Sequence, residues 1–294
     1  MSWRQFSMEL AGLESGRVEQ ALMSLGAQAV TYTDAADTPV LEPVRGETPL
    51  WPSTRVSALF PGELDAAEIA EALRHALALD ALPPWHIETL EDRAWEREWL
   101  KDFRAMRFGQ NLWVCPTGYQ VEEPGAVVIH LDPGLAFGTG THATTALCLD
   151  WLDGSWMEGR RVLDYGCGSG ILAVAALLLG AEEAVATDID PQALDASRAN
   201  AARNGVSDRL TTLQPAELDD GRYDVVLANI LATPLIGLAP DLAMRTRSGG
   251  EIVLSGILTG QESEIRTAYE PWFDLGPAAT RDDWILISGR RRVD

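Results

Sequence analysis

A glycine-rich segment in the second half of the chain has the residue types that let a backbone approach a bound ligand. Asp164, Gly166, Gly168 and Gly170 follow one another after an apolar run, and an apolar helical pattern begins at Ile171. Glycine has no Cβ, so it tolerates positive φ and close contact with a ligand. In open parallel sheets, nucleotide-like ligands bind at the first turn from strand to helix. We therefore predict that these glycines line such a site.

The spacing of the glycines separates two classes of nucleotide-like ligand. Dinucleotide-binding loops follow the pattern G-x-G-x-x-G and place a pyrophosphate at the start of the helix. This loop instead reads G-x-G-x-G, and Asp164 stands two residues before the first glycine. S-adenosyl-L-methionine has no phosphate but carries an ammonium and a sulfonium, which a carboxylate attracts. The pattern favours this methyl donor as the cofactor, with a nicotinamide-dependent oxidoreductase as the alternative.

A second acidic motif follows the next strand-like run. Asp188 ends that run about 20 residues after the glycine loop, where an acid can accept hydrogen bonds from both ribose hydroxyls. Asp190 is followed by Pro191, which is typical of an N-cap and the first residue of a helix. The position at the strand end favours Asp188 as the ribose ligand. The alternative is that both acids only cap the helix.

Two further motifs place polar side chains next to predicted strands. Asn229 follows an apolar strand-like run, so it either lines the acceptor pocket, contacts the cofactor or starts a helix. The segment 131–145 is dense in glycine and threonine and ends at Thr145. It either folds over a ligand or forms a turn with an N-cap. It contains His142, for which we expect a structural hydrogen bond, and we assign no catalytic residue.

The elements that must position these residues form an alternating pattern. The strand-like runs are 161–164, 184–188, 223–228, 251–254 and 284–288. The helical runs between them are 171–179, 191–204 and 233–246. Apolar strands that alternate with helices need crossover connections and are covered on both faces. We therefore predict a doubly wound, mostly parallel, Rossmann-like α/β sheet over 120–294.

The first 91 residues follow a different pattern. Strand-like runs at 3–10, 27–33, 55–60 and 86–90 and helical runs at 14–25 and 65–79 give the order β-α-β-β-α-β. This order predicts a small α+β, ferredoxin-like domain over 1–91. Trp95, Trp99 and Phe103 recur at four-residue spacing within 91–103 and predict a linker helix with one aromatic stripe. Residues 92–119 are expected to form this linker and a connection.

Composition excludes some partners and sites. The formal net charge of −21 over 294 residues disfavours nucleic acid and anionic membranes and favours a cationic partner. We find no targeting segment and no apolar run long enough to cross a bilayer, so we expect a cytoplasmic protein. Three widely spaced cysteines and four scattered histidines have no metal-ligand spacing. We expect no metal and buried, reduced cysteines.

Taken together, these motifs resemble the PrmA type of ribosomal protein methyltransferases over nearly the whole chain. The resemblance runs through 96–99, 106–109, 112–116, 131–145, the glycine loop, 188–191 and 229–232. It implies an enzyme that methylates lysine side-chain and N-terminal amines of the large-subunit ribosomal protein L11. It also implies a donor site that includes Thr145, Gly166, Asp188 and Asn229. Ile230 and Leu231 stand where amide methylases have two prolines, which agrees with an amine acceptor.

The resemblance also implies a separate role for each domain and for the linker. The first domain would hold the substrate protein, and the linker would let the catalytic domain reach several amines. We expect a monomer. Another protein's lysine or a small amine as the acceptor stays open, because the catalytic motifs do not distinguish these substrates.

Overall fold

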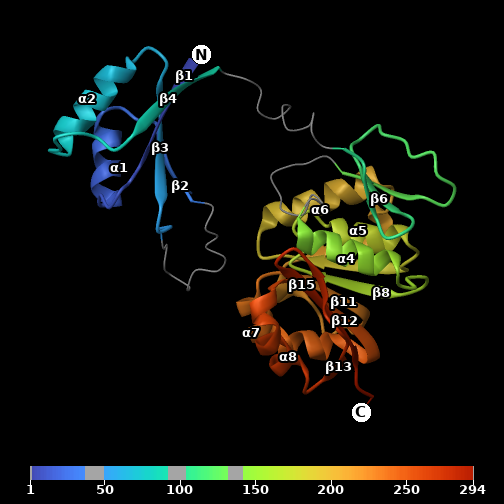
Figure 1. Ribbon diagram of the computed structural model, residues 1–294. Helices are drawn as coiled ribbons and strands as arrows, with labels where there is room; N and C mark the ends of the chain where they lie inside the picture. Colours follow the sequence, from blue (N-terminus) through green and yellow to red (C-terminus); the bar gives the residue numbers. More distant parts are fainter. Residues whose placement is uncertain (1, 37–49, 92–103, 132–141, 294) are drawn as a thin grey trace. The chain divides into compact units, whose positions relative to one another are not determined.

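The computed structural model describes residues 2–36, 50–91, 104–131 and 142–293 (Figure 1). The chain divides into two compact units, Met1–Trp95 and Glu96–Asp294. The expected division into 1–91, 92–119 and 120–294 stays a prediction, and the linker helix expected at 91–103 lies outside the described residues from 92 onward.

The first unit is a four-stranded antiparallel sheet with two helices. Its elements are β1 (Ser2–Glu9), α1 (Ser15–Ser24), β2 (Ala29–Asp34), β3 (Thr54–Pro61), α2 (Ala66–Ala76) and β4 (Trp85–Glu91). The strand order is β2-β3-β1-β4, which confirms the ferredoxin-like prediction. Alternate strand residues such as Phe6 and Val56 pack against Val18, Leu22 and Leu73 of the helices, which lie on one face of the sheet (Figure 1).

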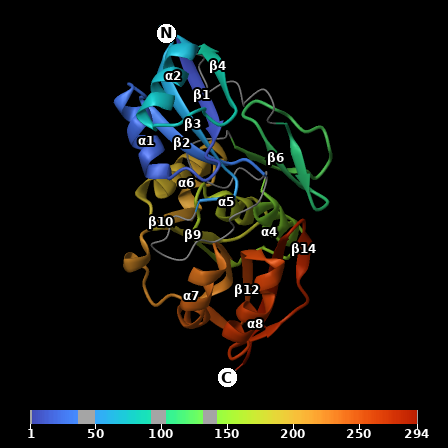
Figure 2. The same ribbon diagram turned by 60° about the vertical axis from the view of Figure 1, so that its left-hand side comes forward.

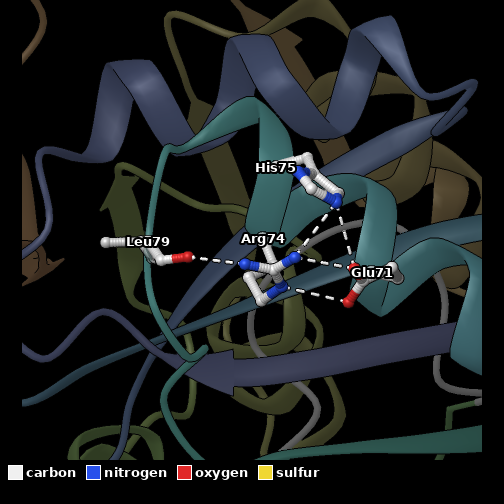
Figure 3. Close-up of polar contacts among 4 residues, drawn as sticks. All are labelled: Glu71, Arg74, His75 and Leu79. Carbon is white, nitrogen blue, oxygen red and sulfur yellow. Dashed lines mark hydrogen bonds and ion pairs between the residues drawn. The ribbon is translucent and has the colours of Figure 1, made fainter.

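Helix α2 shows how local polar contacts end an element of this unit. Asp65 caps the helix start, because its carboxylate accepts from the backbone N–H groups of Ala67 and Glu68. Near the other end, the Arg74 guanidinium donates to both carboxylate oxygens of Glu71 at 2.7 and 3.0 Å and to the Leu79 carbonyl at 3.0 Å (Figure 3). Arg74 therefore ties the end of α2 to the chain that follows it.

The second unit contains a larger sheet in the order β10-β9-β8-β11-β12-β15-β13, with β14 paired to β15. Its strands are β8 (Arg161–Tyr165), β9 (Glu183–Thr187), β10 (Leu210–Leu213), β11 (Tyr223–Asn229), β12 (Thr246–Leu258), β13 (Phe273–Leu275), β14 (Ala279–Arg281) and β15 (Trp284–Arg291). The strands from β10 to β12 are parallel, and the others are antiparallel. This confirms the predicted mostly parallel sheet.

Helices cover both faces of this sheet. They are α4 (Ala143–Asp153), α5 (Ile171–Leu178), α6 (Pro191–Arg203), α7 (Ala232–Arg245) and α8 (Glu262–Tyr269). One apolar core joins the sheet to α4, α5 and α6, and a second core joins it to α7 and α8. These helix groups lie on opposite faces (Figures 1 and 2). The sheet is therefore doubly wound, as predicted.

A small three-stranded sheet was not predicted. Its strands β5 (Met106–Phe108), β6 (Leu112–Cys115) and β7 (Val127–His130) pack against α4 and α5 of the second unit. The β5–β6 turn is held by carboxylates at the end of α4. The N–H of Gly109 donates to Asp150 at 2.7 Å, and that of Asn111 donates to Asp153 at 3.1 Å. Part of the expected connection is therefore regular structure.

Two further properties of the described chain bear on its chemistry. Among the helices of the described ranges, none has both the length and the apolar character needed to span a bilayer. All three cysteines of the sequence, Cys115, Cys148 and Cys167, are buried free thiols. Burial raises the pKa of each thiol, so each stays protonated and unreactive at neutral pH.

Candidate functional site

Three predicted site residues stand at the ends of three adjacent parallel strands. Gly166 follows β8, Asp188 follows β9, and Asn229 is the last residue of β11. In the sheet, Tyr165 pairs with Thr187 of β9 and with Ala228 of β11. Because parallel strands end at the same edge, the structure brings these three residues together at the carboxyl edge of the sheet.

The glycine loop takes a backbone conformation that favours glycine at each of its three positions. Gly166, Gly168 and Gly170 have φ values of +75°, +52° and +73°. The N–H groups of Gly166 and Cys167 both donate to the carbonyl of Thr187, at 2.8 and 3.0 Å. The loop is thereby tied to the end of β9. A Cβ at position 166 would also overlap the Cγ2 of Ile230.

Asp188 contacts the glycine loop directly. Its Oδ2 accepts from the Gly168 N–H and its Oδ1 from the Asp190 N–H, each at 3.0 Å. Each carboxylate oxygen has two acceptor positions, so Asp188 can still accept hydrogen bonds from a diol. Asp190 caps α6, accepting from the Gln192 N–H at 2.9 Å, and Pro191 is the first helical residue. The predicted cap at Asp190 is confirmed.

The two polar motifs further along the sheet also meet. The Asn229 side-chain amide donates to Thr145 Oγ1 at 3.3 Å. Thr145 is buried in the first turn of α4, and Asn229 is half-buried. Ser255 lies beside Asn229 on β12 and donates from its hydroxyl to the Thr144 carbonyl at 3.2 Å. The start of α4 is therefore held against the end of β11 and the neighbouring part of β12.

Asp164 lies deeper than its position beside the glycine loop indicated. Its side chain is only 1% exposed, and its Oδ2 accepts from the Ala173 N–H of α5 at 3.1 Å. Burial raises the pKa of Asp164 to about 7; the Ala173 hydrogen bond opposes this, and the charge of Asp188 adds to it. The structure places this carboxyl in the core beneath the loop, whereas Gly166, Asp188 and Asn229 follow or end strands.

His142 takes the structural part predicted for it. Its side chain caps α4, with Nδ1 2.8 Å from the Thr144 hydroxyl and 3.4 Å from the Thr144 N–H. Its ring meets the ring of Trp284 edge to face, with centroids 5.0 Å apart. Because Nδ1 accepts from the Thr144 N–H, the imidazole acts as the N-cap of helix α4.

Two features of the site were not predicted. Ile189, between the two acids, is 85% exposed at the same sheet edge as Asp188. The sequence shows an isoleucine between two acids, but only the structure shows that its side chain is exposed. On α6, Ser197 and Asn200 contact the back of the glycine loop. The three-residue spacing of Ser197 and Asn200 on a helix can be read from the sequence. Their partners are backbone carbonyls, and no sequence motif indicates which backbone group a side chain will contact.

The described residues hold no group of three or more His, Cys, Asp or Glu side chains arranged for a metal ion.

Comparison with known proteins settles the family. The family model described as ribosomal protein L11 methyltransferase (PrmA) matches residues 2–292. The chain belongs to this family. Family members named ribosomal protein L11 methyltransferase include one from Pseudomonas aeruginosa (strain LESB58), 52% identical over 295 residues and covering 100% of both chains. Another, from Azotobacter vinelandii, is 53% identical over 293 residues, covering 99% of this chain and 100% of that one.

A solved structure of the family shares the fold. The crystal structure of ribosomal protein L11 methylase from Lactobacillus delbrueckii subsp. bulgaricus covers 65% of this chain and 100% of that chain, with 34% identity and a TM-score of 0.60. The resemblance predicted from the motifs is confirmed. The chain is an S-adenosylmethionine-dependent methyltransferase of the PrmA family, which decides against the nicotinamide-dependent alternative.

Proposed function

We propose that this chain transfers methyl groups from S-adenosylmethionine to lysine side-chain and N-terminal amines of ribosomal protein L11. The family's name supports the identity of the acceptor protein. The convergence of Gly166, Asp188 and Asn229 at one sheet edge supports the placement of the reaction. Because the acceptor is a ribosomal protein, we also infer a cytoplasmic location, and we expect the chain to act as a monomer.

We assign the donor site to the residues predicted for it, namely Thr145, Asp164, Gly166, Gly168, Gly170, Asp188 and Asn229. Asp188 retains acceptor positions for both ribose hydroxyls, and the exposed Ile189 beside it offers an apolar surface to an adenine ring. The glycines leave the loop backbone open to the rest of the cofactor. These observations fit a sulfonium nucleoside. Asp164 acts from beneath the loop, where its carboxyl accepts from the Ala173 N–H and ties the end of β8 to the first turn of α5.

The acceptor amine must reach the site without its extra proton. When bound, S-adenosylmethionine supplies a methyl group on a sulfonium, which a neutral amine can attack in line. Lysine has an ordinary pKa of about 10.4, so the site has to favour the neutral amine by removing water from it. The Asn229 amide nitrogen is directed at Thr145. Its carbonyl is thereby turned from Thr145 and can accept from the amine N–H, which orients the nitrogen lone pair.

The proposal is tested by transfer of label. Purified protein, isotopically labelled S-adenosylmethionine and unmethylated large-subunit proteins are incubated together, and labelled products are identified by mass spectrometry. We expect label on L11, at lysine side chains and the N-terminal amine. Asp188→Asn serves as the control and is expected to abolish labelling, because an amide cannot accept from both ribose hydroxyls as a carboxylate does. Label confined to another protein would refute L11 as the acceptor.

A further inference from the structure

Helix α6 contacts the glycine loop through two side-chain hydrogen bonds. The Ser197 hydroxyl donates to the Gly168 carbonyl at 3.2 Å, and the Asn200 amide donates to the Ser169 carbonyl at 2.8 Å. Residues three apart lie on one face of a helix, so both donors approach from the same side. Both side chains are buried, Ser197 fully and Asn200 with 7% exposed.

The orientation of the Asn200 amide is determined by a second contact. Arg203, one turn further along α6, donates to Asn200 Oδ1 at 2.6 Å. The oxygen of the amide therefore faces Arg203, and the nitrogen faces the loop. Ser169 is itself only 4% exposed, so its carbonyl depends on protein donors rather than on bulk water. Loss of this donor would leave a buried acceptor without this hydrogen bond, which is costly.

Asp188 contacts the same short segment of loop. The Gly168 N–H donates to the Asp188 carboxylate, while the carbonyls of Gly168 and Ser169 accept from α6. Helix α6 begins at Pro191, three residues after Asp188. Helix α6 therefore follows the acid closely in the chain and also contacts the glycine loop that the acid binds.

The polar face of α6 continues to the strand before the 131–145 segment. Asn204, four residues after Asn200, pairs with the backbone of His130. Its Oδ1 accepts from the His130 N–H at 2.8 Å, and its Nδ2 donates to the His130 carbonyl at 2.9 Å. His130 is the last residue of β7. One helix face thus contacts both the glycine loop and the end of β7.

From these contacts we propose that Asn200 is a positioning residue for binding of S-adenosylmethionine. By donating to the Ser169 carbonyl, it holds the glycine loop in the conformation that faces Asp188 before the cofactor arrives. A loop that is already in the binding conformation raises the apparent affinity, because less of the binding free energy is spent on ordering it. This inference rests on the proposed donor site.

The sharpest test replaces one atom. In Asn200→Asp, one carboxylate oxygen still accepts from Arg203, but the other faces the Ser169 carbonyl without a proton to donate. We expect the Kd for S-adenosylmethionine, measured by calorimetry, to rise roughly tenfold. The kcat at saturating cofactor should stay within about twofold of wild type, because bound cofactor orders the loop. Asn200→Ala and Ser197→Ala should raise the Kd in the same direction and serve if the aspartate variant does not fold.

Thr246→Val is the matched control. Thr246 is buried, and its hydroxyl donates to the Leu242 carbonyl at 2.8 Å at the start of β12, the opposite end of that strand from Ser255. Its loss should lower the Tm and leave the Kd unchanged. If the Asn200 variants lower the Tm as this control does and also keep the wild-type Kd, the positioning role is wrong. A fall in kcat with unchanged Kd would overturn it as well.

A wrong assignment of the donor site would give a different set of Kd values from a wrong role for Asn200. Asp188→Asn is measured in parallel, and wild-type affinity in that variant would overturn the donor site and this inference together. Loss of binding in Asp188→Asn, with wild-type affinity in all variants of Asn200 and Ser197, would overturn only the inference.

Discussion

The side-chain amide of Asn229 donates to the hydroxyl of Thr145, and the two residues are 84 positions apart in the sequence. This contact joins the end of β11 to the first turn of α4. Two motifs that are far apart in the sequence therefore meet beside the glycine loop. In the reaction proposed above, the Asn229 carbonyl is the group that accepts from the incoming amine.

Loss of the Thr145 hydroxyl should impair the enzyme without unfolding it. In Thr145→Val the Asn229 amide loses its acceptor, and we expect kcat/KM for the acceptor protein to fall roughly tenfold. Thr145→Ser keeps the hydroxyl and should retain most of the activity. Steady-state methylation kinetics of both variants check this. Equal activity in the valine and serine variants would show that the contact does not matter for turnover.

Gly166→Ala should abolish cofactor binding. The residue has a φ of +75°, and a Cβ there would overlap Ile230, the neighbour of Asn229. Gly159→Ala is the matched control, since Gly159 has a φ of +68° but nothing within 4 Å of the added Cβ. Both substitutions carry backbone strain of roughly 1–2 kcal/mol, but only the first displaces site residues. Calorimetric Kd values for S-adenosylmethionine, with Tm values alongside, separate the two effects.

The buried carboxyl of Asp164 should make stability depend on pH. Its pKa is raised to about 7 by burial, so between about pH 4 and pH 7 the folded chain keeps a proton that the unfolded chain releases. The contribution of Asp164 to the free energy of unfolding therefore falls as pH rises through this window, by about 1.4 kcal/mol per unit, and levels off above it.

Asp164→Asn removes this contribution. Urea unfolding of the two proteins without cofactor, at a series of pH values, gives the difference in their free energies of unfolding. We expect the variant to gain on the wild type as pH rises toward 7 and the difference to stay constant at higher pH. A difference that does not change with pH would show that Asp164 is ionised throughout.

The main elements could be predicted from the sequence because their periodicity is strong. The runs at 161–164, 184–188 and 223–228 correspond to β8, β9 and β11, each within a residue or so of its observed end. The short strands β5, β6, β10, β13 and β14 were not predicted, since three or four residues carry too little pattern. Helix α8 was also missed.

The site could be predicted in part, for a similar reason. Gly166, Asp188 and Asn229 follow or end strands, and strand ends are readable from apolar patterns. The depth of Asp164 and the contacts of Asn200 depend on packing between elements. Their partners are the backbone groups of Ala173 and Ser169. Because nearly every residue has the same backbone groups, the sequence does not indicate which of them a side chain will contact.

His142 should tolerate replacement by another good capping residue. Asn is among the best N-caps, so His142→Asn should keep both stability and kcat. His142→Ala should lower the free energy of unfolding by about 1 kcal/mol and leave kcat near wild type. Thermal unfolding and single-turnover methylation check these expectations. Loss of turnover in a fully folded His142→Asn variant would instead give the imidazole a chemical part in the reaction.

Association with a basic acceptor protein should be sensitive to salt. The chain carries a formal net charge of −21, which attracts a cationic partner over distances that ions screen. We expect kcat/KM for L11 to fall by roughly tenfold or more between low and high ionic strength. The Kd for S-adenosylhomocysteine, which has no net charge, should hardly change over the same range. A flat kcat/KM would exclude steering.

The burial of Cys115, Cys148 and Cys167 has a practical consequence for spectroscopy. With thiols protonated and shielded from solvent, the wild-type chain should react slowly with maleimides and iodoacetamides. A fluorophore or spin label could then be attached to one engineered surface cysteine without first removing the native ones. The native thiols of the wild-type chain would then not compete with the engineered cysteine for the label.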